Sequence, residues 1–443
     1  MADRPEASDL REAHAHVYES ELARSMLDLG LCASADDMLG MLRERAAAAA
    51  REQEIAGAGG RILAHSARPE GWQIPTWPTL AEIDTATAAA GPGTPCCVWC
   101  FDYHAMLCNS AALAIAGFDN SSADPTNGRL GRNERGDLTG LVYEAAAGIA
   151  WEAVMGDPRD AAALAQAGRD TLDGLLAFTV HGFGEVHDLK TRPWMPAALR
   201  AAAHGDALPA KLVLWPLVET LGDVFESREA WASKHGDMQL GGGKIFVDGT
   251  LNSRTAWMLH DYADVDAAAA HPRGMSIMSV DDIAAAINVA DGYGLPIAAH
   301  AIGDGAVRAV LDALERAEPT ARGHRIEHAE LIDEADVPRI VRLRDEVGLK
   351  ISVQPCHLLT DIEALERAVP GRLSRVLPLR ELVDAGLEPG RDLMFGSDSP
   401  IVRPDPEDSV LAATTRGRLG DAGRIAPQQA ITEAEAWACF ARS

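Results

Sequence analysis

Short apolar segments rich in β-branched residues alternate along this chain with longer segments of helical period. This alternation is typical of βα units, in which parallel strands are joined by crossover helices. Eight such segments match a TIM-like (β/α)₈ barrel. The sequence therefore predicts an α/β fold, with residues 1–443 forming a single barrel. The first predicted strand ends in residues 14–17, and the others cover 178–187, 211–215, 243–247, 295–300, 325–328, 349–353 and 393–398.

One gap between predicted strands is too long for a single crossover helix. About 160 residues separate His16 from Phe178, and they include a β-like piece at 61–65 and a Pro/Gly-rich stretch at 69–95. We expect residues 60–150 to form an insertion or subdomain after strand 1, over the active-site face. Long insertions at such places usually carry substrate contacts.

The composition excludes several kinds of partner. Lys and Arg number 40 against 66 Asp and Glu, for a formal charge of −26, which argues against nucleic acid or an anionic membrane. No run approaches the length of a membrane span, and the opening ten residues carry no secretory signal. The seven cysteines are therefore expected to be reduced thiols in a cytoplasmic protein. The cluster at 96–100 lacks a second Cys/His pair at zinc spacing, so we expect it to be structural.

Residues suited to metal binding stand at the ends of several predicted strands. Side chains at the carboxyl ends of barrel strands converge on one site. Residues i and i+2 of a strand face the same way, so two histidines of the first strand can bind one ion. Imidazole and carboxylate groups suit Zn²⁺ and similar ions. The candidates are His14, His16, Lys244, His300, His328 and Asp398.

These residues lie in stretches that are similar to a known family. The chain resembles the metal-dependent amidohydrolase superfamily, and within it the amidohydrolase-3 or YtcJ-like branch. The resemblance spans nearly the whole chain and implies a metal-dependent hydrolase. The matching stretches are AHAHV at 13–17, CFDYHAMLCNSAAL at 100–113, GFGEVHD at 182–188, KIFVDGTLNSRTA at 244–256, HAIGDGAV at 300–307, HRIEHAEL at 324–331, SVQPCH at 352–357 and GSDSPI at 396–401.

The resemblance implies one or two divalent metals per chain, with Zn²⁺ as the default and Mn²⁺, Fe²⁺ or Co²⁺ compatible. An ammonium cannot ligate a cation, so Lys244 needs deprotonation or conversion by CO₂ into a carbamate. A mononuclear site in which Lys244 only pairs electrostatically stays open. The implied roles are His14 and His16 on the first metal, carbamylated Lys244 as the bridge, His300 and His328 on the second metal, and Asp398 on the first metal and as general base.

Other residues are candidates for substrate binding, each beside a structural alternative. His104 lies in the insertion, and it can equally be a structural histidine. Asp248 and Arg254 follow the Lys244 strand, where an ion pair that anchors the loop is an equal interpretation. Gln354 and His357 end the seventh strand and can line the pocket. His187 and Asp188 end the second strand, where they can support the metal ligands.

The chain departs from the family at both ends. Typical members carry flanking strands that pair into a small β-sandwich, but here 13 residues precede His14 and 45 follow Asp398. The tail at 428–443 reads as one helix. We therefore expect the β-sandwich to be absent, and a homodimer is the candidate assembly.

Three functions remain in view. The leading one is a metal-dependent hydrolase that cleaves a non-peptide C–N bond of a small molecule by metal-activated hydroxide. Its substrate group is an amide, an N-acyl group or an N-substituted formamide. The second is a mononuclear aminohydrolase, or deaminase, of a ring substrate, which needs no bridging Lys244. The third is an inactive barrel that retains the fold, against which the intact ligand set argues.

Overall fold

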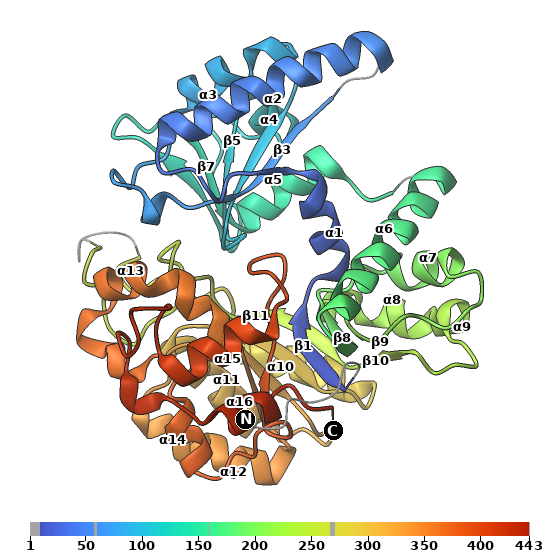
Figure 1. Ribbon diagram of the computed structural model, residues 1–443, viewed down its shortest axis with the longest axis vertical. Helices are drawn as coiled ribbons and strands as arrows, with labels where there is room; N and C mark the ends of the chain where they lie inside the picture. The colour runs from blue at the N-terminus through green and yellow to red at the C-terminus, as the bar shows by residue number, and fades with distance from the viewer. Residues whose placement is uncertain (1–8, 57–59, 159, 266–270, 443) are drawn as a thin grey trace. The chain divides into compact units, whose positions relative to one another are not determined.

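The computed structural model describes residues 9–56, 60–158, 160–265 and 271–442 (Figure 1). The first eight residues, where no export signal is expected, lie outside these ranges. The chain divides into two compact units. We call residues 1–21 and 160–443 the main unit, and residues 22–159 the inserted unit. The inserted unit is longer at both ends than the expected 60–150.

Two parallel sheets form the centre of the main unit. One has four strands in the order β1-β8-β9-β10, and the other has five in the order β11-β12-β13-β14-β15. Every neighbouring pair within them is parallel. The strands are β1 (Leu10–Ala15), β8 (Phe183–Leu189), β9 (Lys211–Trp215), β10 (Met238–Leu240), β11 (Gly243–Phe246), β12 (Ile297–Ala301), β13 (Arg325–His328), β14 (Lys350–Val353) and β15 (Leu393–Phe395).

Backbone bridges join the two sheets at two places. Leu217, which follows β9, forms a parallel bridge with Lys244 of β11. Ala15 of β1 forms another with Ser399, which follows β15. The amide of Asp398 also donates to the carbonyl of His14 at 2.7 Å. The first strand is thereby tied to the last parallel strand of the chain.

Helices connect most of the successive strands of the main unit. The Ser279 hydroxyl and the Asp282 carboxylate form a capping box at the start of α10, as helix termini require. Gly168 of α6 lets that helix approach α7, since a Cβ atom there would lie 2.4 Å from the carbonyl oxygen of Ala198. The helices are α1 (Val17–Ser25, which continues into the inserted unit), α6 (Ala161–Val180), α7 (Met195–Ala202), α8 (Leu221–Glu226), α9 (Arg228–Trp231), α10 (Val280–Gly292), α11 (Asp304–Ala317), α12 (Val337–Val347), α13 (Leu358–Ala368), α14 (Leu379–Asp384), α15 (Pro406–Thr415) and α16 (Glu433–Ala438), with 3₁₀ turns at 218–220, 334–336, 355–357, 370–375 and 427–429.

The inserted unit is a six-stranded sheet in the order β2-β3-β4-β5-β7-β6. Alternate residues of β4 face two separate apolar cores, Cys96 and Val98 in one and Cys97 and Trp99 in the other. The cysteine cluster is thus part of the packing, as expected, and its thiols are free. The elements are β2 (Leu27–Asp28), α2 (Ala35–Ala56), β3 (Ile62–Ala67), α3 (Leu80–Thr87), β4 (Cys96–Cys100), β5 (Ala105–Cys108), α4 (Ser110–Ile115), β6 (Gly128–Arg132), β7 (Leu138–Glu144) and α5 (Ala145–Met155), with 3₁₀ turns at 69–71 and 88–90.

Two sequence-based boundaries were wrong. Residues 178–180 end helix α6, so the second strand begins at Phe183 instead of Phe178. Gly182, with φ of 92°, makes the turn between them. The tail is a short 3₁₀ turn followed by α16, because the capping box of Thr432 starts a new helix there. Within the described ranges, no helix has the length and apolar character needed to cross a bilayer.

Candidate active site

Three predicted ligands meet at the carboxyl ends of strands in the main unit. One side-chain donor atom each from His14, His328 and Asp398 lies within 4.8 Å of the other two, and all three residues are buried. His14 belongs to β1, His328 ends β13 and Asp398 follows β15. Parallel strands present their carboxyl ends at one edge, which explains how positions so far apart in sequence come together.

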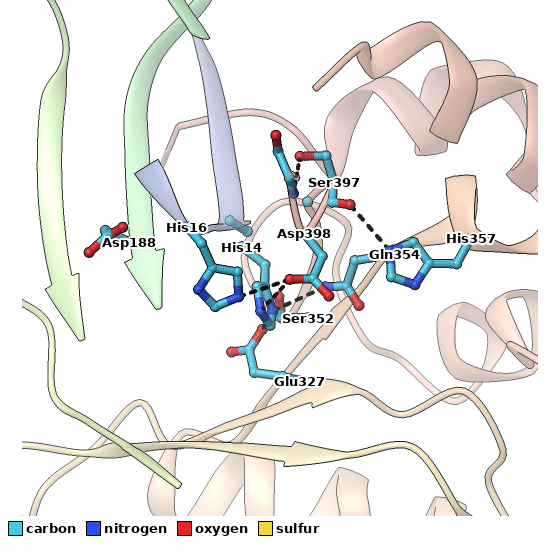
Figure 2. A network of polar contacts seen from close by, with 12 residues as sticks. His14, His16, Asp188, Glu327, Ser352, Gln354, His357, Ser397 and Asp398 are labelled. Carbon is cyan, nitrogen blue, oxygen red and sulfur yellow. Dashed lines mark hydrogen bonds and ion pairs between the residues drawn. The ribbon is translucent and has the colours of Figure 1, made fainter. Parts of the chain in front are cut away.

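Two further histidines join this group. His16 Nε2 lies 3.0 Å from Asp398 Oδ1, and His14 Nε2 lies 3.2 Å from the same oxygen. Figure 2 shows both rings directed at Asp398. The ring of His300 lies 4.4 Å from that of His328 between centroids. In the structure, however, His300 Nε2 faces the carbonyl oxygen of Gly249 at 3.1 Å.

Lys244 is fully buried beside this group. Its Nζ has no hydrogen-bond partner in the described part of the chain, and it lies 4.7 Å from the centre of the Phe246 ring. Burial lowers the pKa of Lys244 to about 8, although Glu327 and Asp398 oppose that shift. A buried amine without a hydrogen-bond partner is costly, which makes this position a candidate for a functional role.

The electrostatics favour a neutral His328 imidazole and a charged Asp398 carboxylate. Burial and the neighbouring His300 and His14 hold the pKa of His328 well below its usual range. Burial raises the pKa of Asp398, but His14 and His16 outweigh it and hold that pKa well below its usual range. Neutral imidazole and ionised carboxylate are the protonation states in which these groups bind metal.

A comparison with family profiles identifies the family of a chain with this cluster of histidines and a carboxylate. The profile described as "Amidohydrolase family" matches residues 10–442. The chain belongs to the amidohydrolase family. Membership identifies it as a hydrolase.

Relatives of this amidohydrolase have diverse names. It is 26% identical over 419 residues to YtcJ of Bacillus subtilis (strain 168), named as an amidohydrolase, covering 91% of this chain and 72% of that one. It is 25% identical over 423 residues to the protein LONG AFTER FAR-RED 3 of Arabidopsis thaliana, covering 92% and 68%. It is 25% identical over 376 residues to the N-substituted formamide deformylase of Arthrobacter pascens, covering 81% and 65%.

Two solved structures share the fold. The uncharacterized metal-dependent hydrolase from Pyrococcus furiosus has a TM-score of 0.66 at 23% identity, covering 97% of this chain and 80% of that one. The one from Pyrococcus horikoshii OT3 has a TM-score of 0.69 at 22% identity, covering 97% and 78%.

The donor set of this amidohydrolase fits a divalent metal. Imidazole nitrogens and a carboxylate oxygen are ligands that Zn²⁺ and related ions prefer. His328 Nδ1 is buried and has no hydrogen-bond partner within the described residues, as expected of an atom reserved for a ligand. His14, His16 and Asp398 would hold one ion, and His328 and His300 would hold a second.

Two of the candidate substrate residues lie at the same site. Gln354 Nε2 lies 3.4 Å from His14 Nδ1, while its Oε1 is buried with no hydrogen-bond partner among the described residues. His357 Nε2 lies 3.2 Å from the carbonyl oxygen of Ser397, and its ring lies 6.1 Å from that of His328. Both follow β14, so the sequence placed them at the correct strand end.

Asp248 and Arg254 have structural contacts. Asp248 accepts hydrogen bonds from the backbone amides of Trp257, Ile302 and Gly303 at 2.8, 3.0 and 2.9 Å. Arg254 pairs with Asp264, with its Nε 2.9 Å from Oδ1. These contacts anchor the loop after β11.

His104 belongs to the inserted unit. Its Nδ1 lies 2.7 Å from Glu144 Oε2, at the start of α5. The amide of Glu144 also donates to the carbonyl of His104 at 2.9 Å. Glu144 thus fixes both the ring and the backbone of His104.

The support of the site by Glu327 and Arg325 was missed in the sequence. Glu327 Oε2 lies 2.8 Å from His14 Nδ1, and Glu327 Oε1 lies 2.7 Å from Arg325 Nε. Burial raises the pKa of Glu327, but Arg325 and His14 bring it down to about 2. The sequence did offer a signal for this support. Arg325 and Glu327 are opposite charges at alternate positions of a strand that was expected to be buried.

The backbone of β13 explains why this signal was hard to use. Consecutive strand residues point to opposite faces, so Glu327 should face away from His328. Instead His328 has φ of 70° and Ala329 has φ of 43°, both in the left-handed region. This turn lets Glu327 and His328 both approach the ring of His14, the latter at 4.9 Å between centroids.

Proposed function

We propose that this amidohydrolase cleaves a C–N bond of a small molecule that is not a peptide, in an amide, an N-acyl group or an N-substituted formamide. The convergence of His14, His328 and Asp398 at strand ends carries the proposal. The name of the Arthrobacter pascens relative supports a formamide among the substrates.

We further propose that the two parallel sheets close into one (β/α)₈ barrel. Two bridges support closure. Ala15–Ser399 joins β1 to the segment after β15, and Leu217–Lys244 joins the segment after β9 to β11. In such a barrel the carboxyl ends of all eight strands surround one pocket.

A bound Zn²⁺ or similar ion supplies the Lewis acidity that polarises a carbonyl oxygen and makes water more acidic. Asp398 takes a proton from the attacking water and delivers it to the leaving nitrogen. Its Oδ1 faces His14 and His16, so we assign the transfer to the second carboxylate oxygen.

The remaining groups orient the substrate or the metals. Gln354 and His357 contact the substrate from the end of β14. His104, whose ring Glu144 fixes, is assigned a contact with the substrate. Lys244, as its carbamate with CO₂, would help to hold the metal. Its burial and the absence of a hydrogen-bond partner for its Nζ among the described residues support this role.

The test combines elemental analysis with an activity screen. Purified wild type, D398N, K244A and the exposed-lysine control K234A are assayed against N-formyl, N-acyl and aminated-ring compounds. We expect two metals per chain in wild type and K234A, at most one in K244A, and a loss of kcat in D398N of roughly 10²–10⁴-fold, as for removal of a general acid–base group.

Two results would overturn the proposal. One is a single metal per chain together with hydrolysis of the aminated ring only, which identifies a deaminase. The other is the absence of any turnover by fully loaded wild type across the panel, which identifies an inactive barrel.

A further inference from the structure

We propose that Glu327 is a positioning residue that holds the His14 ring in one tautomer, with its Nδ1 protonated and its Nε2 directed to the metal. The inference rests on the proposed function for the presence of the metal. Glu327 is not one of the proposed metal ligands, so the inference adds a residue to the site.

The shortest polar contact of the His14 ring, to Glu327, favours the tautomer that binds metal. His14 Nδ1 lies 2.8 Å from Glu327 Oε2, and His14 Nε2 lies 3.2 Å from Asp398 Oδ1 (Figure 2). An ion-paired carboxylate accepts hydrogen bonds and donates none, so Nδ1 carries the hydrogen in the Glu327 contact. In the tautomer with its hydrogen on Nδ1, Nε2 offers the lone pair that a metal ion needs, on the side of Asp398.

Arg325 fixes Glu327 in turn. Its Nε lies 2.7 Å from Glu327 Oε1, and the side chains of both residues are at most 2% exposed. Its remaining nitrogens donate to the carbonyl oxygen of Ala13 at 2.6 Å, to Ser352 Oγ at 3.0 Å and to His187 Nδ1 at 2.8 Å. The guanidinium is therefore tied to strands β1, β8 and β14 as well as to its own strand.

A chain of polar contacts continues away from the site. His187 Nε2 donates to Glu185 Oε1 at 3.0 Å, and Lys211 Nζ lies 3.1 Å from Glu185 Oε2. Lys211 is the partly exposed end of this chain, with 30% of its side chain exposed. Glu185 thus shares the network with Glu327 but does not touch a ligand, so it provides a matched control.

The contact between Glu327 and His14 should affect the affinity for metal, whereas a side chain that only packs should not. A carboxylate that holds the second ring nitrogen orients the imidazole and raises its basicity as a ligand. Removal of such a partner typically weakens metal binding by about 10–100-fold. A residue that only contributes to stability would leave the affinity of the folded protein unchanged.

The experiment compares wild type, E327Q, E327L and E185Q as folded proteins, with folding checked by circular dichroism. The Zn²⁺ dissociation constant is measured by competition with a chromophoric chelator. The ring ¹⁵N shifts of His14 are measured without metal, and assigned by their loss in H14Q.

We expect E327L to lose the single tautomer of His14, and E327Q and E327L to bind the first Zn²⁺ roughly 10–100-fold more weakly. E185Q should stay within about threefold of wild type, because it leaves the His14 contact in place.

Unchanged Zn²⁺ affinity in folded E327Q would overturn the inference, even if E327L does not fold. An unchanged ¹⁵N pattern in folded E327L would do the same. The tautomer is read without metal or substrate, so an inactive wild type would contradict the proposed function and leave this result standing.

Discussion

At the scale of single residues, Gly396 determines how closely the Asp398 loop approaches β1. A Cβ atom at Gly396 would lie 2.5 Å from the amide nitrogen of His14 and 2.6 Å from Glu12 Oε1. Glu12 Oε1 accepts hydrogen bonds from the amides of His14 at 3.1 Å and Ser397 at 2.8 Å. A buried carboxyl group, whose pKa burial raises to about 8, therefore joins the two segments that carry His14 and Asp398.

Replacing Gly396 by alanine should disturb this junction. We expect G396A to lower the free energy of unfolding by about 1–3 kcal/mol, as overpacking of a core does. Zn²⁺ affinity should fall as well, because the backbone of His14 must move. Chemical denaturation and metal titration measure the two effects.

Gly292 provides the control for that change. It ends helix α10, and a Cβ atom there meets no atom within 4 Å. G292A should stay within about 1 kcal/mol of wild type, since alanine favours helix over glycine. Equal stabilities of G396A and G292A would show that the close approach at Gly396 carries no cost.

The ligands were predictable from the sequence to different degrees. His14, His300 and His328 could be placed because each lies at the last or next-to-last position of a strand of regular βα rhythm. Glu327 could not, because the left-handed turn at His328 overrides strand alternation and has no glycine to mark it. The Arg254–Asp264 pair also escaped prediction, since it depends on a loop path that local propensity does not specify.

At the scale of elements, His324 ties the start of β12 to the segment before β13. The amide of Ile297 donates to His324 Nδ1 at 3.2 Å, and His324 Nε2 donates to the carbonyl of Ala321 at 3.0 Å. Both ring nitrogens are thus used by a neutral imidazole. Burial lowers the pKa of His324 to about 4, with only partial compensation from Ala321 and Asp291.

This shift makes stability depend on pH in a defined window. Above pH 6.5 the His324 ring is neutral in both the folded and the unfolded chain, so its contribution to the free energy of unfolding is fully present. Between pH 6.5 and 4 the unfolded chain binds a proton that the folded chain does not, so stability falls with acidification. The ordinary pKa of 6.5 and the folded value of about 4 correspond to a loss of about 3 kcal/mol.

Denaturation of metal-free protein at pH 7, 6, 5 and 4.5 tests this expectation. H324Q should be less stable than wild type at pH 7, and the difference should shrink as the pH falls. Carboxylates titrate equally in both proteins, so the comparison isolates the imidazole. Parallel stability curves for the two proteins would contradict the assignment.

Strand order was the most predictable feature at this scale. The bounds of β9 and β13 agree with the predicted 211–215 and 325–328, because turn residues and helices flank them clearly. The second strand was misplaced because the apolar end of α6, residues 178–180, has no helical period of its own and continues into β8 through Gly182.

At the scale of the whole molecule, each unit has its own hydrophobic core. The cores of the inserted unit draw on residues 22–155, and those of the main unit on residues 10–17 and 172–440. The sequence indicated an insertion but not its limits. Helix α2 begins at Ala35 without a composition change that would separate it from the main unit.

Because the two units have separate hydrophobic cores, we expect them to unfold in separate transitions. We expect calorimetry to show two components, of which metal removal by a chelator lowers the midpoint of only one. Metal at about 1,000 times its dissociation constant stabilises the state that binds it by about 4 kcal/mol. The inserted unit should be insensitive, because the described ligand group lies in the main unit.

The inserted unit expressed alone, residues 22–159, identifies the calorimetric transition that does not respond to metal removal. Its midpoint should coincide with the transition that the chelator leaves unchanged. A single transition that shifts as a whole would contradict independent unfolding.

The position of the insertion also affects synthesis on the ribosome. Strand β1 is made first, yet its parallel neighbour β8 begins about 170 residues later, and Ser399 is later still. At about 5–20 residues per second, β1 waits roughly 8–34 s for that neighbour. All six residues of β1 are buried in the finished protein. The nascent chain therefore exposes a strand that is fully buried in the finished protein while the inserted unit is being translated. Chaperone binding would protect it during this interval.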